Sequence, residues 1–161
     1  PMSRFWFILG IFVTNIILVF FQMGVLFNTG AVNFGINIMN NLWYLLVFVL
    51  AAVMTFTLLG MLIAYLVNSE QTSILISTFI ILFLFLLSDA VFPVQAMPAF
   101  ARFLAAINPL MIFKELFRYS LFYKPNFLDV GWQLFLSAGY FVVGFISVTL
   151  ADFAFKRRNL K

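Results

Sequence analysis

The sequence contains no cysteine and no histidine among its 161 residues. Disulfide bonds are therefore excluded, and the commonest general base and metal ligand of proteins is missing. Only 9% of the residues are charged, against about 25% in a soluble domain. The five carboxylates are scattered and do not gather on one helix face. The sequence therefore disfavours an enzyme, and it offers no catalytic residue, no metal site and no cofactor site.

Apolar residues are what the chain has most of. Hydrophobic residues make up 65% of the sequence, and the mean hydropathy is +1.15. A soluble chain of this size cannot bury so much apolar surface and still cover itself with polar groups. The apolar stretches recur along the chain and are too long for a signal peptide. The sequence therefore predicts an all-α integral membrane protein.

The basic residues fit a membrane protein better than a nucleic-acid binder. The formal net charge of +4 comes from few residues, and several of these flank apolar segments. They are Arg4 and a C-terminal cluster of Lys156, Arg157, Arg158 and Lys161. Cations in such places normally mark the cytoplasmic side of a membrane. A basic tail that binds nucleic acid is the disfavoured alternative, so no nucleic-acid partner is expected.

Four segments are predicted to span the bilayer. A spanning helix needs about 20 apolar residues, and the ranges 5–27, 42–67 and 132–155 meet this requirement. The apolar run 72–87 has only 16 residues, or about 24 Å as a helix. We expect it to extend to residue 93 in order to reach the other side.

The flanking charges and aromatic residues predict the orientation. With both termini in the cytoplasm, four crossings place the loop 28–41 and the segment from about 88 to 131 outside, and the turn 68–71 inside. Tryptophan and tyrosine gather at membrane interfaces. Trp6 would then lie at the inner border, and Trp43, Tyr44 and Trp132 at the outer border. Four cations in the outer segment oppose this orientation: Arg102, Lys114, Arg118 and Lys124.

Two short helices are predicted in the outer segment, over 98–107 and 109–123. Pro98 suits a first helical turn, and Asn108-Pro109 ends one helix and begins the next. Each helix is too short to span, so we expect a hairpin that lies on, or dips into, the outer leaflet. Asp129 is expected to cap the last spanning helix.

Three charged residues in the outer segment are candidate functional residues. Asp89 lies near the outer edge of the hydrocarbon core, and two interpretations of it stay open. The carboxylate either caps the end of the helix or starts a turn, or it faces a transport path or pairs with Arg102 or Arg118. Glu115 and Arg118 are three residues apart and can pair on one helix face.

The stretch from Leu86 to Arg118 resembles the C-terminal signature of type-2 ATP-binding-cassette (ABC) exporter permeases. The matching residues follow the order and spacing of that signature, and they are Leu87, Ser88, Phe92, Pro93, Met97, Pro98, Phe100, Asn108, Pro109, Leu110, Glu115 and Arg118. Two positions depart from the family pattern. Asp89 stands where glycine is usual, and Phe100 stands where tryptophan is common.

This resemblance implies a fold and a set of partners. The family fold has six spanning helices per subunit with two reentrant or interfacial helices before the last, so residues 1–161 would form one incomplete permease domain that lacks the first two helices. Expected partners are an ABC ATPase subunit, a second permease subunit and membrane lipid. ATP and Mg would bind the ATPase, because this chain has no GxxxxGK[ST] motif.

The implied function is export across the plasma membrane. Both ends of this chain would be cytoplasmic, and the substrate would be a lipophilic drug, a lipid-like molecule or a glycan. A non-transporting membrane scaffold or assembly subunit is the alternative. Rows of small residues spaced by four suggest dimer contacts or packing within one subunit, and they are Gly60/Ala64, Ser69/Ser73/Ser77 and Ser147/Ala151.

Overall fold

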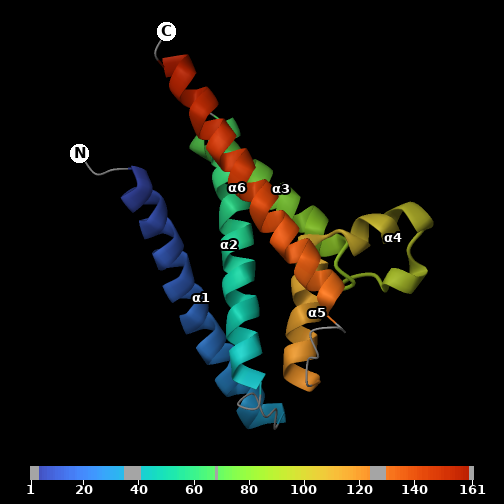
Figure 1. The fold of residues 1–161 in the computed structure, drawn as a ribbon. Coiled ribbons are helices and arrows are strands. Elements are labelled where there is room, and N and C mark those ends of the chain that lie inside the picture. Colours follow the sequence, from blue (N-terminus) through green and yellow to red (C-terminus); the bar gives the residue numbers. More distant parts are fainter. Residues whose placement is uncertain (1–3, 35–40, 68, 124–129, 160–161) are drawn as a thin grey trace.

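The computed structural model describes residues 4–34, 41–67, 69–123 and 130–159. In these ranges the chain forms helices and no strand. The elements in chain order are α1 (Arg4–Phe34), α2 (Leu42–Leu66), α3 (Glu70–Leu86), the 3-10 helix η2 (Val94–Ala96), α4 (Ala99–Ala106), α5 (Pro109–Phe122) and α6 (Gly131–Asn159). Figure 1 shows that α1 begins and α6 ends at the same end of the molecule.

Three helices are long and apolar enough to cross a membrane. The spans are Ile8–Asn33, Leu42–Leu66 and Gly131–Phe153, with mean hydropathies of 2.2, 2.6 and 2.0. They belong to α1, α2 and α6. Many of their large side chains are exposed, as expected where lipid rather than protein covers a helix. The prediction of an all-α membrane protein is confirmed.

The helix predicted over 72–93 is shorter in the structure. The 17-residue helix α3 ends at Leu86, so it is about 26 Å long. The chain turns at Ser88 and Asp89, and Asp89 has a φ of 60°, which is outside the right-handed helical region. Residues 88–93 therefore do not extend α3 across the membrane. The prediction that this helix continues to residue 93 is wrong.

The helix predicted over 5–27 is longer in the structure, since α1 continues to Phe34. Two side chains in its last turns bond back to carbonyls one turn earlier. The Thr29 hydroxyl donates to the carbonyl of Val25, and the Asn33 amide donates to the carbonyl of Thr29, both at 2.9 Å. The predicted outer loop 28–41 is therefore partly helical.

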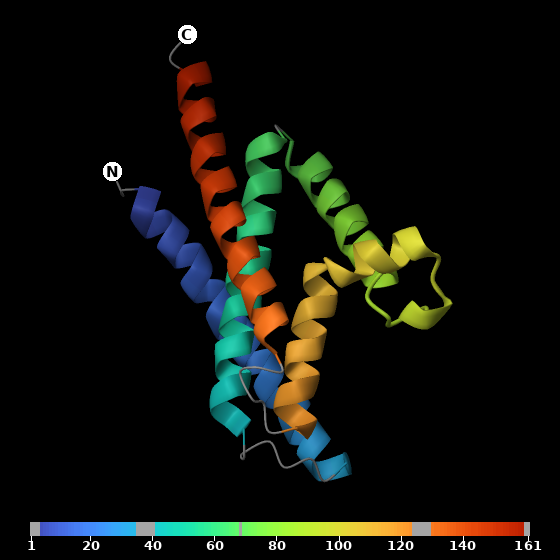
Figure 2. The same cartoon turned by 45° about the vertical axis from the view of Figure 1, so that its right-hand side comes forward.

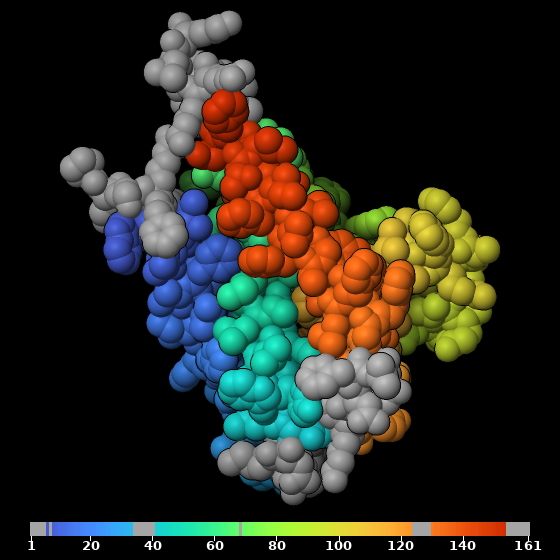
Figure 3. Space-filling view, in the orientation of Figure 1, coloured from blue at the N-terminus to red at the C-terminus, as the bar shows by residue number. Residues whose placement is uncertain are grey.

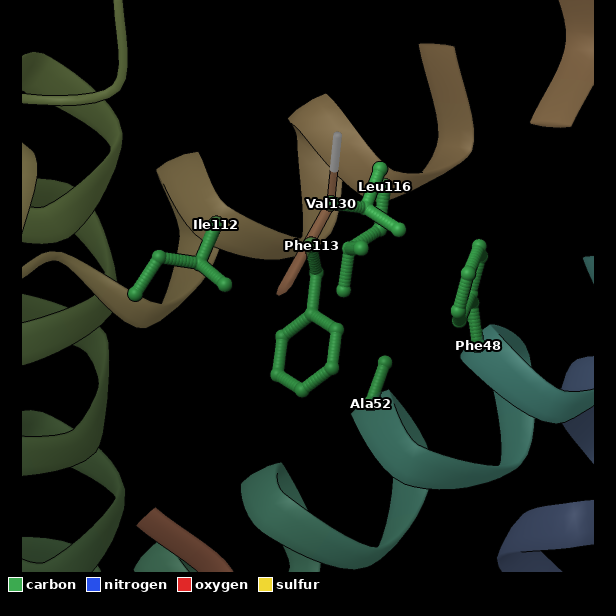
Figure 4. Close-up of a cluster of buried hydrophobic side chains, with 6 residues drawn as sticks. All are labelled: Phe48, Ala52, Ile112, Phe113, Leu116 and Val130. Carbon is green, nitrogen blue, oxygen red and sulfur yellow. The ribbon is translucent and has the colours of Figure 1, made fainter. Parts of the chain in front are cut away.

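The short helix α5 packs inside the bundle. The helix α2 lies at the centre and contacts α1, α3, α5 and α6, and Figure 2 shows α5 descending beside it. The main core cluster joins α2 and α5 to the start of α6, and it contains Phe48, Ala52, Ile112, Phe113, Leu116 and Val130 (Figure 4). The expectation of a hairpin that lies on, or dips into, the outer leaflet did not include this packing of α5 against α2.

The segment that carries η2 and α4 stands away from the bundle, as the space-filling view shows in yellow (Figure 3). Two large apolar side chains of α4 are uncovered within the described chain. Phe100 and Phe103 are exposed, with 74% and 62% of their surfaces accessible. The hairpin therefore consists of one helix that packs in the bundle and one that projects from it.

Candidate functional site at the junction of the short helices

Asn108 joins the end of α3 to the start of α5. It is 2% exposed and is the N-cap of α5, with Pro109 as the first helical residue. Its side-chain oxygen accepts a hydrogen bond from the Leu110 amide at 2.9 Å. Its side-chain nitrogen donates to the carbonyl of Leu84 at 2.7 Å. One side chain thus satisfies a free amide at a helix start and a carbonyl near a helix end, which otherwise lack intrahelical partners.

Ser88 lies at the centre of the turn after α3 and is fully buried. Its hydroxyl donates to the carbonyl of Phe85 at 2.7 Å, so it stays within the last turn of α3. The carbonyl of Ser88 accepts a hydrogen bond from Lys114 Nζ at 3.0 Å. The hydroxyl and the carbonyl of Ser88 are therefore both bonded within the protein, and the serine serves to close the turn.

Asp89 follows in the left-handed region, with a φ of 60°. Glycine adopts this conformation most readily, and aspartate is among the few other residues that tolerate it. One carboxylate oxygen accepts from the Val94 amide at 2.8 Å, and the other pairs with Lys114 Nζ at 3.1 Å. The hydrogen bond from Val94, followed by that from Lys114, holds the pKa of the Asp89 carboxyl below its ordinary value of 3.8.

These contacts bear on the two interpretations of Asp89 given above. The carboxylate organises the turn, as the first interpretation held. Its ion-pair partner is Lys114, not Arg102 or Arg118, so the pairing in the second interpretation is wrong. Arg102 instead donates to the carbonyls of Gln95 and Met97, at 3.3 and 3.2 Å.

The remaining signature residues shape the segment between α3 and α5. Pro93 and Pro98 precede η2 and α4 as their N-cap residues, and both have the φ near −55° that proline imposes. Met97 between them is buried, with 7% of its surface exposed. The prolines therefore set where these two short elements begin.

Glu115 and Arg118 form the ion pair predicted from their three-residue spacing. Arg118 Nη2 donates to Glu115 Oε2 at 2.7 Å. The Glu115 side chain is 17% exposed and that of Arg118 is 54% exposed. The guanidinium also lies 6.0 Å from the ring centre of Tyr119, within the range of a cation–π contact. The carboxylate is thus the less solvated partner.

Sequence reasoning missed three contacts that hold the short helices in place. Lys114 was considered only as one of the cations of the outer segment, although it pairs with Asp89. The Tyr140 hydroxyl of α6 donates to the carbonyl of Ile107. The Asn41 amide donates to the carbonyls of Ser120 and Tyr123, at 3.0 and 2.8 Å. In the contacts made by Tyr140 and Asn41 the acceptors are backbone carbonyls. Every residue has such a carbonyl, so the sequence does not indicate which one accepts.

The site is a helix junction. The part of the chain that the structure describes contains no group of three or more carboxylate, cysteine or histidine side chains that could hold a metal ion. What the site provides is a fixed connection between α3, α5 and the projecting segment.

An all-helical fold with three long apolar helices defines the class of multi-span membrane proteins. The family comparison is more specific, since residues 1–122 match the model of the ABC-2 type transporter. This range contains the whole junction, from Ser88 to Arg118. The chain belongs to the ABC-2 type transporter family, and it is a membrane permease domain of an ABC transporter. No curated protein and no solved structure matches the chain.

Proposed function

We propose that this chain is a permease subunit of an ABC exporter, which moves a lipophilic drug, a lipid-like molecule or a glycan out of the cytoplasm. The observation that carries the proposal is the family match over 1–122, which includes the junction. The energy would come from ATP hydrolysed on a separate ABC ATPase subunit, where ATP and Mg bind. The permease would alternate between states open to the inside and to the outside.

The junction supports this mechanism because it links α3 to α5. Lys114 on α5 bonds to the turn after α3, and Asn108 bonds to the last turn of α3. A displacement of α3 is therefore transmitted to α5, which packs on α2 and α6. Linked displacements of this kind are how packed helices pass a change from one side of a domain to the other.

The proposed setting is the plasma membrane, with both ends of this chain in the cytoplasm. Membrane lipid would cover the exposed apolar side chains of α1, α3 and α6. A second permease subunit, identical or related, would complete the transporter. The helix α3 has no buried residue, and its row of Ser69, Ser73 and Ser77 would allow close approach of a helix from that subunit.

Copurification tests the proposal. The chain is expressed in its native host at its natural level with an affinity tag, extracted in a mild detergent and purified, and the bound proteins are identified by mass spectrometry. We expect an ABC ATPase with a P-loop in stoichiometric amount. Recovery of other membrane proteins without any ATPase would favour the scaffold alternative.

A further inference from the structure

The helix α3 ends before it is long enough to cross the membrane, and no helix breaker follows it directly. It ends at Leu86 and is about 26 Å long, against a hydrocarbon core of about 30 Å. Residues 87–92 read Leu-Ser-Asp-Ala-Val-Phe and contain neither glycine nor proline. The first proline is Pro93, which disfavours the helical conformation at the residue before it. The sequence therefore allows α3 to continue to about residue 92.

The carbonyl groups that a longer α3 would need are occupied by side chains of α5 and its N-cap. In a helix each carbonyl accepts from the amide four residues later. The carbonyl of Leu84, which would accept from the Ser88 amide, instead accepts from Asn108 Nδ2 at 2.7 Å. The carbonyl of Ser88, which would accept from the Phe92 amide, accepts from Lys114 Nζ at 3.0 Å. The α5 side therefore competes with the continuation of α3 for the same acceptors.

The turn after α3 carries a cost that Asp89 offsets. Its φ of 60° is unfavourable for any residue with a side chain. The carboxylate bonds to the Val94 amide at 2.8 Å and to Lys114 Nζ at 3.1 Å, which holds the turn in this conformation. The amides of residues 90–92 have no hydrogen-bond partner in the part of the chain that the structure describes. A continued helix would give each of them a carbonyl four residues earlier.

We propose that α3 is a two-state element, which either ends at Leu86 or continues as a helix to about residue 92, and that Lys114 holds the ended form. A helix over residues 70–92 is about 35 Å long and crosses the hydrocarbon core. Movement of α5 away from α3 withdraws Lys114 from both Ser88 and Asp89, and α3 then lengthens by about 9 Å. The part of this change in transport rests on the proposed function, whereas the change itself does not.

Nuclear magnetic resonance of a single residue tests the proposal. Asp89-Ala90 is the only Asp-Ala pair in the sequence, so carbonyl-¹³C aspartate combined with ¹³C,¹⁵N alanine selects the signal of Ala90. The signal is assigned by its loss in Ala90→Ser. The measured quantity is the Ala90 Cα chemical shift of the full-length permease in lipid nanodiscs. Because Ala90 lies in the turn after α3, we expect a non-helical shift in the unchanged protein.

Loss of Lys114 should move the Ala90 signal downfield to the helical range. Lys114→Gln removes the bonds to the turn, and Lys114→Met does so while keeping an unbranched side chain of similar length. Val91→Pro, added to either variant, should restore the non-helical shift, because proline removes the amide at 91 and disfavours a helical residue 90. Arg118→Gln is the matched control, since Arg118 is a cation of the same helix that bonds to Glu115. It should leave the Ala90 shift non-helical.

Two results would overturn the proposal. One is a non-helical Ala90 shift in both Lys114 variants, each shown to be folded by a monodisperse peak in size-exclusion chromatography. The other is a helical shift that Arg118→Gln produces as readily as the Lys114 variants do. The measurement requires neither ATP nor a substrate, so its failure leaves the proposed function intact. In the same way, a permease that copurifies with no ATPase contradicts the proposed function and leaves the two forms of α3 intact.

Discussion

At the scale of single residues, the junction depends on side chains that each serve two partners. Asn108 bonds to an amide of α5 and to a carbonyl of α3, and Asp89 bonds to the Val94 amide and to Lys114. Buried polar groups that lose a partner are costly, whereas an intact bond contributes little net stability. Removal of any one of these side chains is therefore expected to lower the free energy of unfolding by more than the net contribution of its hydrogen bonds.

Asn108→Ala should lower the stability of the folded permease clearly. The change leaves the Leu84 carbonyl and the Leu110 amide without their partner, at a cost of about 1–3 kcal/mol for each buried group. The measurement is the temperature at which the detergent-purified protein loses its monodisperse peak in size-exclusion chromatography. Asn33→Ala is the control, because its amide makes an exposed bond within α1. Equal midpoints for the two variants would contradict the account of the junction.

Asp89→Asn and Lys114→Gln should act on the same interaction. Each single change removes the ion pair, so the double variant is expected to lose less stability than the sum of the two losses. Asparagine tolerates a positive φ as aspartate does. The Asp89→Asn change therefore removes the charge without straining the backbone. Additive losses in thermal stability would mean that the pair contributes nothing.

The lowered pKa of Asp89 gives this pair a defined pH dependence. A carboxyl with a lowered pKa stabilises the fold above its ordinary value, and the stabilisation is lost as the pH falls through the lowered value. The stability difference between the unchanged protein and Asp89→Asn should stay constant from about pH 8 to about pH 5, and should shrink below about pH 4.

At the scale of elements, α5 is a short helix held at both ends. Asn108 and Lys114 connect its first half to α3, and Asn41 binds two carbonyls near its last turn. Between these points Phe113 and Leu116 are buried against α2. This arrangement explains why a helix of 14 residues stays in place although it cannot span a bilayer.

Arg118→Ala should impair transport or assembly more than Lys124→Ala does. Glu115 is only 17% exposed, so the loss of its partner leaves a poorly solvated carboxylate. Lys124 precedes Pro125, is outside the described residues, and serves as the control. An exposed pair of this spacing contributes about 0.2–0.5 kcal/mol, and partial burial of Glu115 should raise the cost of breaking it. Additive losses for Glu115→Gln and Arg118→Gln would show that the two side chains are not coupled.

The sequence allowed the elements to be predicted better than their contacts. Apolar length placed the three long helices, and the prolines placed the starts of the short ones. The end of α3 was misjudged because the length requirement of a spanning helix was given more weight than the turn at Ser88 and Asp89. The contact between Lys114 and Asp89 was missed because it joins residues 25 apart in the chain, a separation without helical periodicity. The cap expected from Asp129 lies outside the described residues.

At the scale of the whole molecule, the orientation in the membrane is the first consequence to check. The account places both termini in the cytoplasm and residues 96–131 outside. Because the chain has no cysteine, a single introduced thiol can be labelled without background. Asn126→Cys should react with a membrane-impermeant maleimide added to intact cells, whereas Ser69→Cys in the inner turn should react only after the cells are opened. The reverse pattern would overturn the topology.

The central claim is that the chain moves a substrate outward with energy from a partner ATPase. The most direct test is uptake of a panel of radiolabelled lipophilic drugs, lipid-like molecules and glycans into inside-out membrane vesicles that contain the permease and its copurified ATPase. The account predicts accumulation that requires ATP and Mg, and that stops when the P-loop lysine of the ATPase is replaced. Equal uptake of every member of the panel with and without ATP, in vesicles whose ATPase is active, would contradict it.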